Sequence, residues 1–192
     1  KQKTAYEIRL SLVGSEMCIR DRGWMILRAT SDGKFRYGDV YVRCALGKGG
    51  VIHATAKREG DGASPIGEWS IRRVLWRADR GPIPETALPV APIARDDGWC
   101  DAPDDRAYNR IVKHPYPASA ERLWRDDHAY DIVVVLGYND APVRPGAGSA
   151  IFWHLAQPDW RPTEGCVAIT EADMRAALKS VRAGDALEID RA

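Results

Sequence analysis

The sequence lacks the features that would tie it to a charged polymer or a bilayer. Its 28 Lys+Arg and 27 Asp+Glu leave a formal net charge of +1, so no excess of one sign favours nucleic acid or an anionic membrane surface. Its longest apolar run, residues 132–136, is far too short to cross a bilayer. We therefore expect no nucleic-acid partner and no membrane span.

Cysteine is also scarce. Four cysteines in a chain of 192 residues do not make a disulfide scaffold, and no CxxC pair indicates a zinc or dithiol redox site. Cys44 and Cys100 could pair in an oxidising compartment, but two buried thiols are the interpretation that we favour. At least one cysteine, Cys166, then needs an explanation of its own.

The composition that remains, 45% hydrophobic and 29% charged, is typical of one soluble globular domain. Residues 1–22 resemble translated sequencing-adapter read-through, and Met25 offers a native start. We therefore expect residues 1–24 to be a non-native extension and 25–192 to be the domain. The alternative is a genuine N-terminal strand over 6–12, where apolar residues alternate with mostly polar ones.

Short β-rich runs separated by Gly and Pro turns predict a mainly β (α+β) fold. The clearest runs are 34–46, which reads as a hairpin, and 68–76, 132–138, 150–156 and 184–190. The start of the third run is apolar and β-branched, which is typical of a buried central strand.

Two helices are expected. Thr170 followed by Asp173 predicts the start of a helix that runs to about residue 181. Ser119 is expected to cap a second, short helix over 119–127, with Glu121 in its first turn. The segment 81–106 is rich in proline and aspartate and is expected to be irregular surface structure.

The most specific local feature is His154 on a predicted strand, followed by the sequence TEGC at 163–166. Side chains alternate along strand 150–156, so His154 faces away from Trp153, which we expect in the core. A nucleophilic cysteine needs a base within hydrogen-bond reach and backbone N–H groups aimed at the developing oxyanion, and Gly165 would let the backbone approach that oxygen. The same spacing also fits a buried thiol and a structural histidine.

Four stretches of the chain occur in the order that one family shows. They are ALGKGG (45–50), SPIGEWSI (64–71), FWHLA (152–156) and TEGCVAI (163–169). Together they resemble the L,D-transpeptidase catalytic domain, the YkuD-like family, over about residues 34–170. The resemblance implies a β-sandwich of two packed sheets with a C-terminal helix.

Two positions depart from the family pattern S/T-H-G-C-x-R. Glu164 stands where the family usually has His, and Ala168 where it usually has Arg. A carboxylate beside the thiol would raise the thiol pKa unless a cation offsets it. His128 could supply a second imidazole in place of the one missing at 164.

The stretches WCDAPDDRAYNR and GYND resemble a divergent proteobacterial subgroup that shares the TEGC variant, so we interpret the departures as a subgroup signature.

The resemblance implies acyl transfer on peptidoglycan stem peptides, which is cell-wall chemistry of the periplasm. Cys166 would attack the carbonyl that precedes a D-amino acid, release that residue, and pass the thioester-bound peptide to an acceptor amine. His154 would be the base, and the N–H groups of Gly165 and Cys166 would form the oxyanion hole. No metal or organic cofactor is expected, and we expect a monomer.

Further residues are candidate contacts for the stem peptide. A guanidinium such as that of Arg110 could hold a carboxylate bidentately, and an aromatic face such as that of Trp160 could line a groove. The candidates are Tyr108, Asn109, Arg110, Thr163, Glu164 and Trp160.

Three other functions fit the same residues. An L,D-carboxypeptidase or amidase would use the same site with water as acceptor. A catalytically silent peptidoglycan-binding module would result if Glu164 suppresses the thiolate. A cytoplasmic thiol acyltransferase acting on an unrelated peptide is the third, and the lack of a visible export signal favours it slightly.

Overall fold

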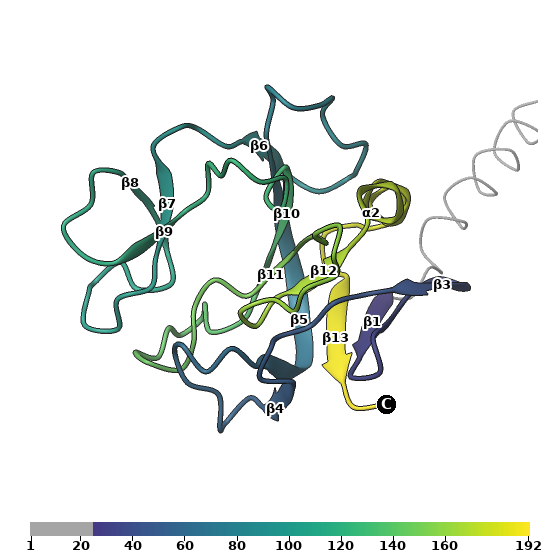
Figure 1. Cartoon of the computed structure of the whole chain (residues 1–192), viewed down its shortest axis with the longest axis horizontal. Coiled ribbons are helices and arrows are strands. Elements are labelled where there is room, and N and C mark those ends of the chain that lie inside the picture. Colours follow the sequence, from purple (N-terminus) through teal and green to yellow (C-terminus); the bar gives the residue numbers. More distant parts are fainter. Residues whose placement is uncertain (1–24) are drawn as a thin grey trace, which may run out of the picture.

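Thirteen strands and one helix make up the described part of the protein, residues 25–192 of this computed structural model (Figure 1). The first strands are β1 (Ile26–Thr30), β2 (Lys34–Tyr37), β3 (Val40–Arg43), β4 (Val51–His53), β5 (Ser64–Trp76), β6 (Val90–Pro92) and β7 (Asp97–Cys100). The remaining elements are β8 (Ile111–Lys113), β9 (Ala120–Arg122), β10 (Ile132–Leu136), β11 (Phe152–Leu155), β12 (Val167–Ile169), α2 (Glu171–Leu178) and β13 (Ala186–Asp190).

Ten strands form one hydrogen-bonded sheet in the order β12-β11-β10-β5-β13-β1-β2-β3, with β4 and β6 also pairing with β5. The 13-residue β5 connects the two halves of this sheet. Its residues 67–70 pair with β13 and its residues 71–76 pair with β10. The other three strands form a small sheet in the order β8-β7-β9, which lies to one side of the large sheet in Figure 1.

The large sheet curls back on itself. Phe35 on β2 and Trp153 on β11 stack with ring centroids 5.2 Å apart. Five strand-to-strand steps, about 24 Å in a flat sheet, would otherwise separate these two strands. At the ends of the strand order, Ala45 after β3 and Ala168 on β12 exchange backbone hydrogen bonds of 2.8 and 2.9 Å. The sheet therefore encloses a core and brings the residues after β3 beside β12.

Two hydrophobic cores lie on opposite faces of β10 and β11. The helix-side core lies within the curled sheet against α2, and its large members include Phe35, Trp153, Leu155, Ile169, Met174, Leu178, Leu187 and Ile189. The cavity-side core lies between β10–β11 and the small sheet, and its members include Trp99, Leu123, Tyr130, Val133, Val135, Phe152 and Cys166. The predicted alternation along β11, with Trp153 in the core, is confirmed.

The mainly β fold of two packed sheets with a C-terminal helix is confirmed. The Thr170 hydroxyl accepts the Asp173 N–H at 3.2 Å, as the predicted cap requires, although α2 ends at Leu178 rather than near 181. No helix within residues 25–192 is long and apolar enough to cross a membrane.

Two local predictions are wrong. Residues 119–127 are not a helix, because 120–122 form β9 and pair with β7. Leu123 then turns fully into the cavity-side core, so tertiary pairing and burial override the local capping signal. The segment 81–106 is not wholly irregular surface either, since it contains β6 and β7, and β7 is buried along its whole length. The predictions for residues 1–24 fall outside the described residues.

Candidate functional site

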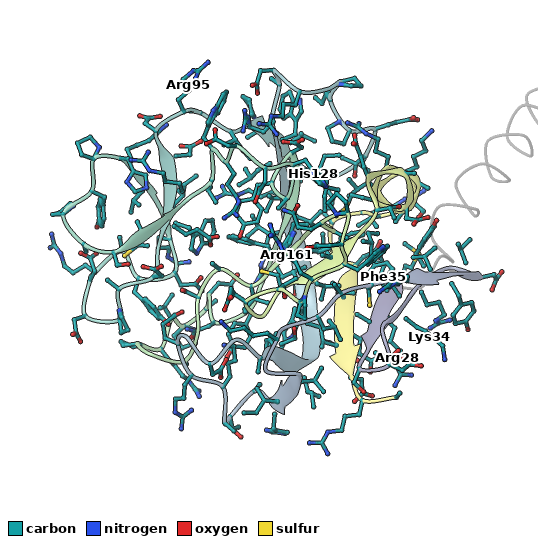
Figure 2. All side chains as sticks on the ribbon, viewed as in Figure 1. Arg28, Lys34, Phe35, Arg95, His128 and Arg161 are labelled. Atoms are coloured by element: carbon teal, nitrogen blue, oxygen red, sulfur yellow. The ribbon has the colours of Figure 1, made fainter. Side chains whose placement is uncertain are left out.

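A cavity of about 580 Å³ opens beside the cavity-side core. Both members of the predicted catalytic pair, Cys166 and His154, line it, as do Thr163 and Glu164. Arg161, which lies near the centre of Figure 2, lines it as well. Its other charged and polar lining residues are Glu59, Asp101, Glu121, Arg125, Tyr130, Ser149 and Gln157.

Cys166 precedes β12 and is buried against the backbone that leads into β11. Its Sγ donates to the Ala150 carbonyl at 3.2 Å and accepts the Phe152 N–H at 3.3 Å. Burial raises the pKa of the thiol to about 12, and the Phe152 N–H offsets only part of that rise. The resting group is therefore a neutral thiol. Cys44 and Cys100 are also free and buried.

His154 lies on β11 with its tautomer set by the backbone. Its Nδ1 is 2.9 Å from the Leu155 carbonyl oxygen. Because a carbonyl can only accept, Nδ1 carries the proton and Nε2 carries the lone pair. Burial lowers the pKa of His154 to about 4, so the imidazole is neutral at neutral pH. A neutral imidazole with a lone pair on Nε2 is the form that a general base needs.

The imidazole lies on β11, and the thiol lies directly before β12, the neighbouring parallel strand. His154 is the register partner of Ala168 on β12, and Cys166 lies two residues earlier in the chain. Alternate residues of a strand share a face, so Cys166 and His154 project from the same face of the sheet. No hydrogen bond joins them within residues 25–192, where Ala150 accepts the thiol proton. The thiol must turn from that carbonyl toward Nε2 before proton transfer.

The TEGC turn is held in place by the other motifs. Ser64 and Thr163 both donate hydroxyl hydrogen bonds to the Cys166 carbonyl, at 3.2 and 2.7 Å. The Gly47 N–H donates to Ser64 Oγ at 2.9 Å, and a Cβ at Gly47 would clash with the Gly62 carbonyl oxygen. The stretches ALGKGG and SPIG are thus the frame of the cysteine turn.

Gly165 brings the backbone past a close neighbour. Its φ is +129°, and a Cβ there would lie 2.9 Å from the Ala63 carbonyl oxygen. The Gly165 N–H donates to Thr163 Oγ1 at 3.2 Å. The Cys166 N–H has no acceptor among the described residues. Of the two N–H groups predicted to form the oxyanion hole, that of Gly165 already donates to Thr163, and only that of Cys166 is free among the described residues to bind an oxyanion.

Glu164 is paired with a cation that the sequence did not identify. Its side chain is 76% exposed and lies 2.7 Å from Lys48 Nζ. Among the charged groups that raise the pKa of the Cys166 thiol, Glu121 has a larger effect than Glu164. The carboxylate that acts most on the thiol therefore comes from β9, and not from the adjacent residue.

Tyr108 and Asn109 do not line the cavity. Both are buried, and the Tyr108 hydroxyl donates to the Glu59 carboxylate. The Asn109 amide oxygen accepts from the Trp99 indole at 2.9 Å, and its amide nitrogen donates to the Tyr138 carbonyl at 3.0 Å. These two residues brace the small sheet against the loop that follows β10.

Three other candidates also lie outside the cavity lining. Arg110 is exposed and donates to the Asp140 carbonyl. Trp160 stacks against Arg43, whose guanidinium carbon lies 4.4 Å from the ring centroid. His128 Nε2 lies 3.0 Å from the Ala156 carbonyl, so its imidazole is committed outside the cavity and does not stand in for the residue missing at 164.

Three residues that line the cavity were not predicted from the sequence as site residues: Glu121, Arg125 and Tyr130. All three lie in the stretch SAERLWRDDHAY, in which residues 119–127 were predicted to be a short helix. The one signal available was Tyr130, two residues before the apolar strand, since a buried tyrosine usually finds a partner for its hydroxyl. Within the described residues, no group of three His, Cys, Asp or Glu side chains could hold a metal ion.

Comparison with known proteins identifies a family. A family model described as the L,D-transpeptidase catalytic domain, YkuD, matches residues 26–189. Among solved structures the chain is similar to Mycobacterium tuberculosis L,D-transpeptidase 1, with 13% sequence identity and a TM-score of 0.41. That similarity covers 86% of this chain and 58% of the other, so this chain spans less than two thirds of that structure. No curated protein matches the chain.

Proposed function

The chain belongs to the L,D-transpeptidase catalytic domain family, YkuD, and on that premise we propose that it is a cysteine-dependent acyltransferase acting on peptidoglycan stem peptides. One observation carries the proposal. A neutral His154 on β11, with its lone pair on Nε2, and Cys166, directly before the neighbouring β12, both line one cavity. We propose the periplasm as its place of action, because the stem peptides are there.

The first half of the reaction forms a thioester. His154 Nε2 takes the proton from Cys166 Sγ as the sulfur bonds to the carbonyl carbon that precedes the terminal D-amino acid. The Cys166 N–H stabilises the negative charge on the carbonyl oxygen. The carbon–nitrogen bond then breaks, and His154 returns its proton to the leaving amine. The D-amino acid departs and the peptide stays on sulfur.

The second half transfers the peptide. An acceptor amine bonds to the thioester carbonyl carbon and loses a proton to His154. The carbon–sulfur bond breaks, and the imidazolium protonates the departing thiolate, which restores the resting pair. Water in place of the amine gives hydrolysis, so the acceptor alone separates a transpeptidase from an L,D-carboxypeptidase.

The proposal is tested by intact-protein mass after incubation with a carbapenem, a β-lactam acyl donor. We expect one adduct on the parent, none on Cys166→Ala, and one on the matched control Cys44→Ala, which removes another buried thiol. Purified muropeptides, with and without an added D-amino acid, then separate transfer from hydrolysis by the products formed.

The silent binding module stays a rival, because the buried neutral thiol of Cys166 is held by Ala150 and not by His154. A folded parent that binds muropeptides as tightly as Cys166→Ala and forms no adduct would replace the proposal with that function.

A further inference from the structure

Position 168 leaves His154 without a large neighbour on β12. Ala168 is the register partner of His154, so only a methyl group stands beside the imidazole on that strand. Tyr130 contacts the imidazole instead, with ring centroids 5.2 Å apart and ring planes at 72°. Both side chains are buried, with 6% of Tyr130 and 8% of His154 exposed. An edge-to-face contact of this kind restricts the orientation of the imidazole.

Tyr130 is itself held by three neighbours. Its hydroxyl donates to Glu121 Oε1 at 2.7 Å. The Arg125 guanidinium carbon lies 5.0 Å from the Tyr130 ring centroid and its Nη1 lies 3.6 Å from Glu121. The Phe152 ring packs edge-on at 6.0 Å. These contacts fix the ring in the orientation in which it meets the imidazole.

We propose that Tyr130, anchored by Glu121, is the positioning residue for His154 in the acyl-transfer reaction. Both residues line the cavity that Cys166 and His154 share. The inference rests on the proposed function of that pair. Tyr130, in the turn before β10, supports the side of the imidazole that Ala168 on β12 leaves without a large neighbour.

Other neighbours of the imidazole act on its charge. When His154 takes the thiol proton it becomes a cation, and Arg125 opposes that protonation whereas Asp127 favours it. The contribution of Tyr130 is therefore the orientation that its ring contact gives to the imidazole.

The test measures the second-order rate constant for acylation of Cys166 by a carbapenem, between about pH 6 and pH 9, on the full chain. We expect Tyr130→Phe to lower it about tenfold, which corresponds to the loss of one hydrogen bond to a charged group. Glu121→Gln keeps an acceptor for the hydroxyl but removes the charge, and we expect a loss of about threefold. Tyr116→Phe is the matched control, because its hydroxyl donates to Asp105 at 2.8 Å outside the cavity, and it should equal the parent.

A second readout separates positioning from stability. The Nδ1–H of His154, which donates to the Leu155 carbonyl, should exchange slowly with water in the parent and in Tyr116→Phe. It should exchange faster in Tyr130→Phe, because a ring without its anchor no longer holds the imidazole against that carbonyl. The ¹⁵N-edited spectrum of the imidazole measures this exchange. Tyr130→Phe with parental acylation and a parental imidazole spectrum would overturn the inference. A parent that forms no adduct would sink the proposed function instead, while the imidazole spectrum would still decide whether Tyr130 positions His154.

Discussion

The two faces of β11 place neighbouring residues in opposite environments. Trp153 is fully buried in the helix-side core and stacks on Phe35, whereas His154, the next residue, lines the cavity. The curled sheet and α2 close the first face. On the second face the small sheet covers Phe152 but leaves an opening at His154 and Cys166. The site therefore lies where a rigid strand is covered incompletely on one face.

The largest expected effect tests this difference directly. Trp153→Ala should lower the free energy of unfolding by about 3–5 kcal/mol, because the closed core cannot fill the space that the indole leaves. His154→Ala should cost only about 1–2 kcal/mol, chiefly the hydrogen bond to the Leu155 carbonyl, because its side chain already borders a cavity. Urea unfolding of both variants measures the two values. Equal costs would mean that the two faces are packed alike.

The next effect concerns pH. Burial lowers the pKa of His154 from 6.5 to about 4, so between these values the unfolded chain binds a proton that the folded chain does not. The contribution of His154 to the free energy of unfolding is therefore complete above pH 6.5. It is lost as the pH falls toward 4, by about 3 kcal/mol in total. Unfolding curves over this range should show that loss in the parent and lack it in His154→Gln. A parent and variant with parallel curves would show that the imidazole has the same pKa in the folded and the unfolded protein.

Sequence patterns predicted the elements whose faces are set locally. Alternation along β11 correctly separated Trp153 from His154, and Thr170 with Asp173 correctly marked the start of α2, because both signals act between residues close in the chain. The positions of Cys166 and His154 in one cavity followed from motif order.

The partners of those residues could not be predicted in the same way. Glu121 reaches the cavity only because β9 pairs with β7, and Lys48 meets Glu164 only because the sheet closes between Ala45 and Ala168. Both depend on tertiary pairing between distant segments, which no local period encodes. The buried bracing role of Asn109 is hidden for the same reason, since its partners lie on β7 and on the loop between β10 and β11.

A smaller effect is expected at the turn that carries the thiol. Gly165→Ala should destabilise the protein by about 1–3 kcal/mol, because φ is +129° and the new Cβ would meet the Ala63 carbonyl oxygen at 2.9 Å. Gly146→Ala is the matched control, since Gly146 has φ +72° but no atom within 4 Å of its would-be Cβ. Thermal unfolding of the two variants separates the close contact from the cost of the left-handed backbone. A Gly165→Ala protein as stable as Gly146→Ala would show that the backbone at Ala63 can move away from the new Cβ at little cost in free energy.

The smallest effect is expected from the ion pair at the mouth of the cavity. Lys48→Met leaves the exposed Glu164 carboxylate unpaired beside the thiol, and solvent screening should limit the fall in the rate of Cys166 alkylation by iodoacetamide to about twofold at low salt. Lys34→Met removes another exposed pair, with Asp32 in the turn between β1 and β2, outside the cavity lining, and should leave the rate unchanged. In all three proteins the rate, followed on the Cys166 peptide, should keep rising with pH up to about pH 10, because burial raises the pKa of the thiol to about 12. A plateau of the rate near neutral pH would mean that the thiolate is already formed at rest. A tenfold loss of rate in Lys48→Met would mean that Glu164, and not Glu121, is the carboxylate with the larger effect on the thiol.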